Sequence, residues 1–365
     1  MTELEALLTL QHVPNLGDGS IKKLIQLIGS AEGVLKEKKS TLLNVEGIGK
    51  ARISNIHDLE HQKAAEKELN FIEKNNLKVT TYLENDYPVH LNQCLDGPVI
   101  LFSSGTINLK EKRILSIVGT RKITQYGLQF CKKLIEDLSP FDPVIVSGYA
   151  YGVDITAHRA AIKNGLQTVA CLAHGLNQIY PKSHKQYMTA MEANGGFFTD
   201  FWSTDAFNPQ NFLRRNRIIA GLSQATIVIE SADKGGSLVT AQIANSYYRD
   251  VFAVPGRTTD TYSKGCNMLI KTQQAHALTC AEDLIYLLDW KQEKQAPKQV
   301  QQSLFIDLDP NEQKVYDYLK TKGKQDLDSI ALQCKIPTYQ LAGLLLNLEL
   351  KGVLEPLPGK LFRAL

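Results

Sequence analysis

The stretch "SIVGTRKITQYG", residues 116–127, decides the fold. It begins as an apolar strand, turns at Gly119 and continues into a helical pattern. Such a turn places backbone N–H groups and a helix N-terminus beside the end of a strand, which is a common phosphate-binding arrangement. Arg121 stands where a dinucleotide site would have a small residue, and its guanidinium can hold a phosphate through two hydrogen bonds. The stretch therefore predicts an α/β fold with an anionic ligand near this turn.

The same pattern repeats through residues 67–288, where apolar strands alternate with helical patterns. This alternation predicts an extended Rossmann-like, mostly parallel sheet with helices on both faces. The strands expected from the sequence are KVTTYL, VILFSSG, RILSIVG, PVIVSG, QTVACLAHG, GGFFTDF, ATIVIE and DVFAVPG.

The flanking segments predict smaller domains. Residues 1–66 contain short helical patterns with glycine turns, of which "VEGIGKARI" fits a helix-hairpin-helix or SAM-like domain. That hairpin either offers backbone N–H groups to a phosphate or serves packing alone. Residues 289–303 are polar and predict a linker. Residues 304–365 read as helices followed by two short strands, which predicts a winged helix. Lys351 is the one basic residue of its presumed recognition helix, so we expect an interaction or regulatory module.

The composition is that of an ordinary globular protein. The net charge of +3 neither requires nor excludes a nucleic-acid partner. The six cysteines are scattered without a CxxC pair, so neither a metal site nor a disulfide framework is indicated. The sequence shows neither a secretory signal nor an apolar run long enough for a membrane helix. We therefore expect a cytoplasmic protein without a membrane partner.

Residues suited to binding an anion follow several predicted strands. Glycine-containing loops come after five strands, and most also carry basic or hydroxyl residues. Because ligands of open parallel sheets bind beyond the carboxyl ends of the strands, five such loops favour a binding edge over simple tight turns. A second basic element is the helix with Arg214, Arg215 and Arg217, of which at least one is expected to serve packing or salt bridges. Lys182 follows Tyr180, whose ring either stacks on a base or shapes a turn.

The motifs of common nucleotide enzymes are missing from the sequence. Neither GxGxxG nor GxxxxGK[ST] occurs, which disfavours an NAD enzyme or a P-loop ATPase, and we expect no cofactor. Asp154 and His158 lie four residues apart, a spacing that fits local hydrogen bonding better than an acid–base pair. Since no nucleophile and base come together in the pattern, we predict no catalytic residues.

Taken in order, the segments "SIVGTRKITQYG", "VSGYAYGVDITAH", "HGLNQIYP", "RRNRIIAGLSQATIVIE", "GGSLVTA" and "VFAVPG" resemble the DNA-processing protein A (DprA, or Smf) family. The resemblance covers most of residues 67–288. It implies a Rossmann-like domain that binds single-stranded DNA, forms a homodimer and interacts with the recombinase RecA. The implied role is to receive and protect incoming single strands during natural transformation and to help load RecA, without catalysis.

The resemblance also implies which residues contact DNA. Arg121 matches the arginine of a Gly-Ser/Thr-Arg motif and is expected to hold a phosphate, while Tyr149, Tyr151 and Tyr180 are aromatic residues near the expected contact. The residues expected to bind single-stranded DNA are Gly119, Thr120, Arg121, Gly148, Tyr149, Gly152, Tyr180, Lys182, Arg215, Asn216, Arg217, Gly236, Ser237 and Thr240.

The sequence departs from the family pattern near the expected DNA pocket. Asn177 replaces the usual aspartate, His184 replaces an asparagine, Gly235 replaces a serine and Leu213 replaces a proline.

An alternative function is a phosphoribohydrolase-like enzyme that releases the base of a nucleoside monophosphate. Such enzymes use a glutamate where Gln242 falls in this chain, and glutamine cannot act as a carboxylate acid or base. A sequence-independent single-strand binder is therefore the favoured function.

Overall fold

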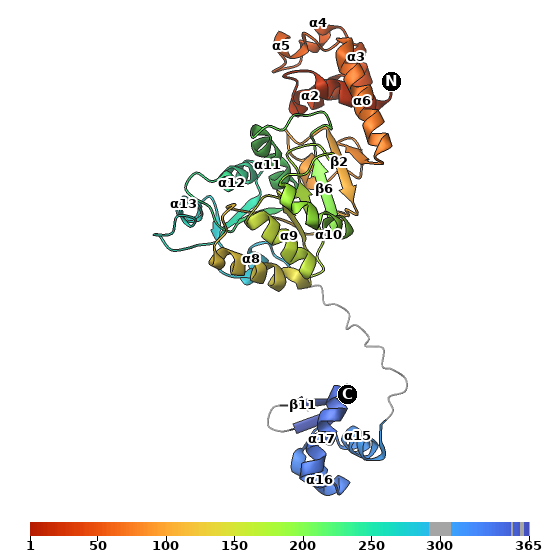
Figure 1. Ribbon diagram of the computed structural model, residues 1–365, viewed down its shortest axis with the longest axis vertical. Coiled ribbons are helices and arrows are strands. Elements are labelled where there is room, and N and C mark those ends of the chain that lie inside the picture. Colours follow the sequence, from red (N-terminus) through yellow and green to blue (C-terminus); the bar gives the residue numbers. More distant parts are fainter. Residues whose placement is uncertain (292–307, 352, 358–360, 365) are drawn as a thin grey trace. The chain divides into compact units, whose positions relative to one another are not determined.

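The computed structural model describes residues 1–291, 308–351, 353–357 and 361–364 (Figure 1). The chain forms two compact units, Met1–Glu293 and Lys294–Leu365. Each unit has a hydrophobic core of its own. None of the helices within the described ranges is long and apolar enough to cross a membrane.

The first unit begins with a cluster of helices. Thr2 and Glu5 cap the first of them through reciprocal side-chain and backbone hydrogen bonds. The last one extends beyond the domain boundary expected after residue 66, because Ile72 still packs into the core of this cluster. The helices are α1 (Glu3–His12), α2 (Asp18–Ile28), α3 (Ala31–Lys36), α4 (Lys39–Leu42), α5 (Lys50–Ile53) and α6 (Leu59–Lys74).

A nine-stranded sheet forms the centre of this unit, in the order β1-β2-β6-β5-β4-β3-β7-β8-β9. The predicted mostly parallel sheet is confirmed: of the pairs described within this sheet, only β1–β2 and β2–β6 are antiparallel. Each stretch expected to form a strand does so, and β9 is an addition. The strands are β1 (Lys78–Thr81), β2 (Ile100–Gly105), β3 (Ile114–Val118), β4 (Val144–Ser147), β5 (Thr168–Cys171), β6 (Gly195–Thr199), β7 (Ala225–Val228), β8 (Asp250–Ala253) and β9 (His276–Ala277).

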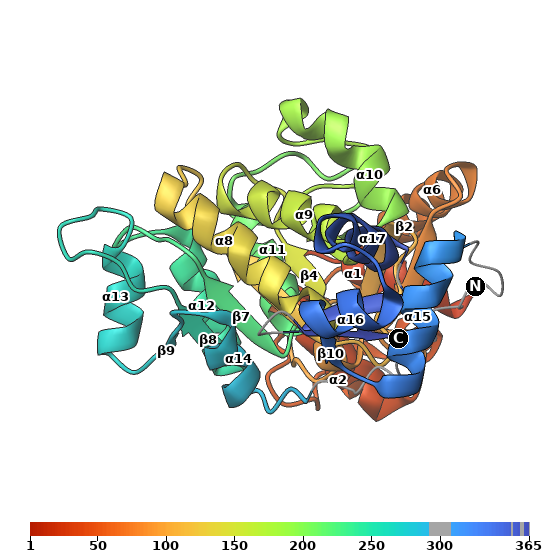
Figure 2. The ribbon, with the colours of Figure 1, turned by 90° about the horizontal axis from the view of Figure 1, so that it is seen from below.

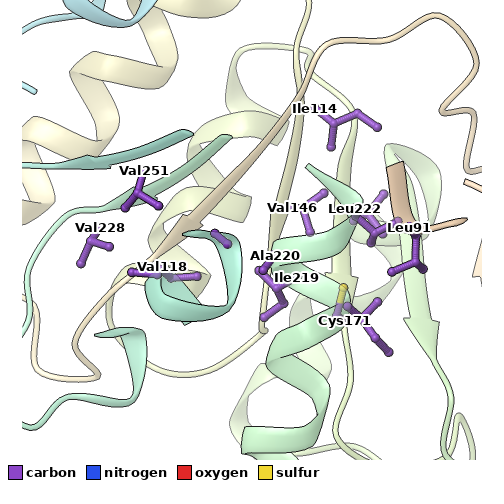
Figure 3. Packing of buried hydrophobic residues seen from close by; sticks show 14 of the residues in the cluster. Leu91, Ile114, Val118, Val146, Cys171, Ile219, Ala220, Leu222, Val228 and Val251 are labelled. Carbon is purple, nitrogen blue, oxygen red and sulfur yellow. The ribbon is translucent and has the colours of Figure 1, made fainter. Parts of the chain in front are cut away.

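Helices cover both faces of the sheet, as Figure 2 shows from below. One face packs on α8 (Gln125–Leu138), α9 (Val153–Lys163) and α14 (Ala281–Leu287). The other packs on α7 (Val89–Asn92), α11 (Gln210–Leu222), α12 (Gly236–Ser246) and α13 (Lys264–Lys271). Figure 3 shows the core on this second face of the sheet, where Ile219 and Leu222 of α11 lie among the strand residues Val146 and Ile114. Short helices η1 (Ser139–Phe141), η2 (Lys182–Tyr187) and α10 (Met188–Ala193) complete the unit.

The second unit is a small winged-helix domain, as the sequence predicts. It contains α15 (Pro310–Lys322), β10 (Gln325–Asp326), α16 (Leu327–Cys334), α17 (Thr338–Leu350), β11 (Leu354–Leu357) and β12 (Leu361–Ala364). Its strands form a separate sheet in the order β10-β12-β11. Most of the expected linker, from residue 292 onward, lies outside the described residues, and so does the turn at 358–360.

Candidate nucleic-acid interface

The loops after β3 and β4 meet at the carboxyl edge of the sheet. Val153 donates its backbone N–H to the Thr120 carbonyl at 3.1 Å, and Thr120 donates to the Glu230 carbonyl at 2.8 Å. Gly152 has a φ of +76°, and a Cβ there would overlap the Thr120 carbonyl oxygen. A Cβ on Gly119 would lie 2.5 Å from a methyl group of Val153. These two positions require glycine because the loops approach so closely.

A carboxylate of the protein fills the crevice at the N-terminus of α8. β3 lies between β4 and β7, so the crevice between the loops after β3 and β7 is where ligands of such sheets bind. The buried Glu230 side chain accepts a hydrogen bond from the Thr124 backbone N–H at 2.9 Å and another from the Thr124 hydroxyl. A Cβ on Gly127 would lie 2.6 Å from a Glu230 carboxylate oxygen, so no space remains there. A phosphate placed inside this crevice would meet a like charge.

Arg121 lies outside this crevice, on an exposed group of aromatic rings. Its guanidinium carbon is 5.3 Å from the centroid of the Phe212 ring, within the range of a cation–π contact. The Phe212 ring contacts Tyr180 and Phe207, with centroids 5.5 and 5.7 Å away, and the centroids of those two rings are 4.9 Å apart. Tyr180 is 39% exposed and Phe207 is 46% exposed. We call Tyr180, Phe207 and Phe212 the aromatic patch.

The other residues expected after β4 and β5 differ in exposure. Lys182 is exposed at the start of η2, directly after the cis Tyr180–Pro181 bond. Tyr151 is also exposed, and its hydroxyl lies 3.0 Å from the Ser183 hydroxyl. Tyr149, by contrast, is buried, and its hydroxyl donates a hydrogen bond to the His184 carbonyl at 2.7 Å. Tyr149 therefore shapes the loop from inside, whereas Lys182 and Tyr151 face the solvent.

Arg215 is buried beneath the loop after β4. Its guanidinium donates to the Gly148 carbonyl at 2.6 Å and to the Cys171 carbonyl. A Cβ on Gly148 would lie 2.6 Å from both this guanidinium and the Asp154 carboxylate. Burial raises the pKa of Asp154 and lowers that of Arg215, while the attraction between the two side chains opposes both changes. Arg215 thus holds two strand ends together from within.

Arg217 joins two regions of the first unit. Its guanidinium contacts the carboxylates of Asp200 and, at 3.1 Å, Asp18 of α2, and it donates to the Asp96 carbonyl at 2.6 Å. Burial alone would lower the pKa of Arg217, but the two carboxylates outweigh it and raise this pKa. The structure therefore brings Arg121 and Arg215 to one edge of the sheet and Arg217 to a contact with the N-terminal helices.

The loop after β7 contributes buried polar groups. Asn216 lies 3.5 Å from the Gly236 carbonyl, and the Ser237 hydroxyl lies 2.9 Å from that of Ser231. A Cβ at Gly235 would lie 2.2 Å from the Ser231 hydroxyl oxygen, so a side chain there would require Ser231 to move. Asn216, Ser237 and Thr240 are all buried, so in this structure they support the loop from below.

Two of the other departures also make internal contacts. The Asn177 amide donates to the Ser203 carbonyl at 2.8 Å, and the buried His184 ring nitrogen lies 3.0 Å from the Tyr149 carbonyl. The spacing of Asp154 and His158 does not make them partners, since the His158 ring nitrogen lies 2.7 Å from the Thr168 hydroxyl. Burial lowers the pKa of His158 to about 3, so this imidazole is neutral at physiological pH.

Sequence reasoning missed Phe207, Phe212 and Glu230. The two phenylalanines occur in "STDAFNPQNF", residues 203–212, where apolar aromatics in a polar, proline-containing segment signal exposed rings. Glu230 directly follows the apolar strand "ATIVI", which places a carboxylate at the same edge as Arg121. Both signals are visible in the sequence once strand ends are compared for acidic and aromatic residues as well as basic ones.

The fold and the carboxyl edge of its sheet define a Rossmann-like protein. Glu230 occupies the crevice at the N-terminus of α8, and the exposed residues outside this crevice are basic and aromatic. Residues 78–289 match the sequence model of the family described as DNA recombination-mediator protein A, and residues 296–360 match the DprA winged helix domain. Since the first match spans more than half of the chain, the protein belongs to the DNA recombination-mediator protein A family, also called DprA or Smf.

Similar proteins come from several bacteria. The chain is 36% identical to DNA processing protein DprA of Streptococcus pneumoniae over 203 residues, which cover 56% of this chain and 71% of that protein. It is 32% identical to Protein Smf of Escherichia coli over 309 residues, covering 82% of this chain and 80% of that protein.

Two solved structures resemble the chain, each at 29% identity. The X-ray structure of S. pneumoniae DprA has a TM-score of 0.67 and covers 78% of this chain and 98% of that one. A structure of Helicobacter pylori DNA processing protein A, described for its single-stranded DNA binding mode, has a TM-score of 0.52 and covers 58% and 95%.

Proposed function

We propose that this protein binds single-stranded DNA without sequence preference, along the rim formed by Arg121, Lys182 and the aromatic patch. The observation that carries the proposal is the Arg121 guanidinium seated over Phe212 within an exposed group of rings. A cation beside aromatic faces suits a single strand, because its phosphates need positive charge and its unpaired bases can stack on rings of any kind. The single-strand binding described for the H. pylori relative supports this proposal.

A further basic residue extends the rim on α11. The exposed Arg214 lies with its guanidinium carbon 5.2 Å from the Phe201 ring centroid. Arg121 and Arg214 thus each contact a phenylalanine ring while remaining open to a phosphate. Duplex DNA offers phosphates but keeps its bases stacked on one another, so the rings favour single strands.

Family membership supports a wider role as part of the same proposal. We propose that the protein is a recombination mediator that receives and protects incoming single strands during natural transformation. In this role it acts as a homodimer and helps load RecA. The match to the recombination-mediator family supports this proposal.

Fluorescence anisotropy with labelled oligo-dT and a matched duplex, at two salt concentrations, tests the binding proposal. Arg121→Ala removes a charge-assisted phosphate contact, and we expect affinity for oligo-dT to fall about tenfold or more. Phe212→Ala removes a stacking surface worth about 1–3 kcal/mol per base, which is roughly a 5- to 150-fold loss. Affinity should also fall steeply with salt.

Matched variants at the opposite edge of the sheet control for charge and aromatic content. Lys163→Ala, in the last turn of α9, removes one exposed charge, and Tyr286→Ala, in α14, removes one exposed ring. Both should bind oligo-dT like the unchanged protein. Equal affinity for duplex and single strand would contradict the proposal. Release of free base from nucleoside monophosphates, abolished by Arg121→Ala, would favour the phosphoribohydrolase-like alternative instead.

A further inference from the structure

A second arginine seated on an aromatic ring lies on α9, beyond the rim. The guanidinium carbon of Arg159 is 5.4 Å from the centroid of the Tyr187 ring of η2, an arrangement that matches Arg121 over Phe212. Arg159 is exposed, and it forms no ion pair with a carboxylate of the described residues. The ring therefore positions the guanidinium, while its charge remains available to a ligand.

A row of rings joins the arginine on α9 to the rim. The Tyr187 ring contacts the buried His184 ring, with centroids 5.8 Å apart, and the His184 ring contacts the Tyr151 ring at 4.9 Å. Tyr151 is 46% exposed, and its hydroxyl lies 3.0 Å from that of Ser183, which follows Lys182 of the rim. The row therefore runs from the rim, through the exposed Tyr151 ring, to α9.

The elements beside this row carry positive charge. In a 3₁₀ helix, side chains three positions apart lie on the same side, so the exposed Lys182 and Lys185 share one side of η2. The acidic residues of α9, η2 and α10 are Asp154 and Glu192. Asp154 is buried, and the half-buried Glu192 carboxylate accepts a hydrogen bond from the Ser104 hydroxyl at 3.1 Å. These three elements therefore present cations to a phosphate without an exposed carboxylate to repel it.

We propose that a long single strand leaves the rim over Tyr151 and continues across η2 to α9, where Arg159 holds a further phosphate. This inference rests on the proposed single-strand function and lengthens its site. The exposed Tyr151 ring can stack on a base of any kind, and the Arg159 guanidinium can hold a phosphate without reading the base beside it. The extension therefore keeps binding independent of sequence.

The extension serves only strands that are long enough to reach it. Arg159 is six residues after Val153, where α9 begins beside the Thr120 carbonyl at the edge of the sheet. At 1.5 Å per residue, it lies about 9 Å from that edge along the helix axis. A short strand that ends on the aromatic patch or at Lys182 does not reach Arg159, whereas a longer strand contacts both places.

Anisotropy titrations of the full chain with two lengths of oligo-dT test this path. Single-strand binding domains of the OB fold cover about 4–16 nucleotides, so oligomers at the two ends of this range separate the rim from its extension. We expect Arg159→Ala to weaken binding of the long oligomer at least fivefold. The salt dependence of that binding should also lose about 0.7 of its slope, the value for one phosphate. Binding of the short oligomer should change less than twofold.

Lys163→Ala is the matched control, because it removes an exposed charge one turn further along α9, and both oligomers should bind it normally. A loss for Lys163→Ala equal to that for Arg159→Ala would overturn the path, since net charge alone would then explain both.

The two lengths also distinguish the extension from the rim. If Arg121→Ala weakens binding of both oligomers while Arg159→Ala weakens neither, the extension is wrong and the rim stands. Equal losses of the two oligomers for Arg159→Ala would likewise overturn the extension, because Arg159 would then act on strands too short to reach it. If Arg121→Ala weakens neither, the rim proposal itself is wrong.

Discussion

Two arginines at the same edge of the sheet differ in almost every respect. Arg121 is exposed and rests on the Phe212 ring, whereas Arg215 is 4% exposed and donates to the carbonyls of Gly148 and Cys171. Both belong to segments that predict phosphate contacts. The difference teaches that a basic motif beside a ligand site can serve the ligand or the loops that surround it, and that burial decides between the two.

The same contrast occurs within α11. Arg215 and Arg217 use their charges in contacts within the protein, whereas Arg214 is exposed and Phe212 belongs to the aromatic patch. We therefore expect substitutions at Arg215 and Arg217 to change stability and substitutions at Phe212 and Arg214 to change affinity. The following predictions test this division, beginning with the largest effect.

Arg215→Ala should destabilise the protein most. It leaves the buried Asp154 carboxylate without its cation and two carbonyls without a donor, and breaking a buried pair in this way costs about 3–5 kcal/mol. Chemical denaturation followed by circular dichroism measures the loss. Arg214→Ala, at the next position on the exposed side, should cost less than about 1 kcal/mol. Equal stability losses for the two variants would break the comparison.

The buried His158 predicts a pH dependence of stability. Because burial lowers its pKa in the folded protein to about 3, from 6.5, the unfolded chain binds a proton in this range that the folded chain does not. Stability contributed by this neutral imidazole is therefore lost as pH falls below 6.5, by up to about 1.4 kcal/mol per pH unit. Denaturation midpoints between pH 7 and pH 4 should fall less steeply for His158→Asn. If the denaturation midpoints of both proteins fell equally steeply with pH, titratable groups other than His158 would dominate the pH dependence of stability.

Most of the fold follows from the sequence because strands and turns are local features. Every expected strand is present, since apolar runs followed by glycine turns determine βα repetition without reference to distant residues. The burial of Arg217 is not local: its partner Asp18 is 199 residues away, and Asp200 follows a different strand. No spacing within "RRNR" shows which carboxylate will meet which arginine.

Glu230→Gln tests the closed crevice. The amide oxygen can accept one of the two Thr124 hydrogen bonds, but the amide nitrogen cannot accept the other, and the negative charge at the N-terminus of α8 is lost. We expect a stability loss of about 1–2 kcal/mol. Affinity for oligo-dT should change less than twofold, because the proposed rim lies outside the crevice. A large loss of affinity for oligo-dT would show that the DNA strand binds inside the crevice.

Lys182→Ala should have the smallest effect. A single exposed lysine contributes about 1 kcal/mol or less, which corresponds to roughly a fivefold loss of oligo-dT affinity at most. If Lys182 contacts one phosphate, the salt dependence of binding should also weaken, with a slope reduced by about 0.7. Anisotropy titrations over a range of salt concentrations measure both quantities. An unchanged slope would remove Lys182 from the interface.

The candidate site was less predictable than the fold. Arg121 and Lys182 were expected from strand ends, and both are exposed there. The patch that completes the rim was not, because Phe207 and Phe212 follow no glycine turn and reach Tyr180 only through the folding of the loop between β6 and α11. Contacts between two loops depend on where each preceding strand ends relative to its neighbours in the sheet. The pattern of residues along the sequence does not contain this information.

The closed crevice at Glu230 has a topological consequence. A pocket that encloses its ligand must admit an end or a small molecule, whereas a rim accepts a chain that continues past it in both directions. A strand held by the proposed rim therefore needs no free terminus. Circular single strands should compete for the protein as well as linear ones of the same length, so a gap in the middle of a long molecule is as accessible as its tip.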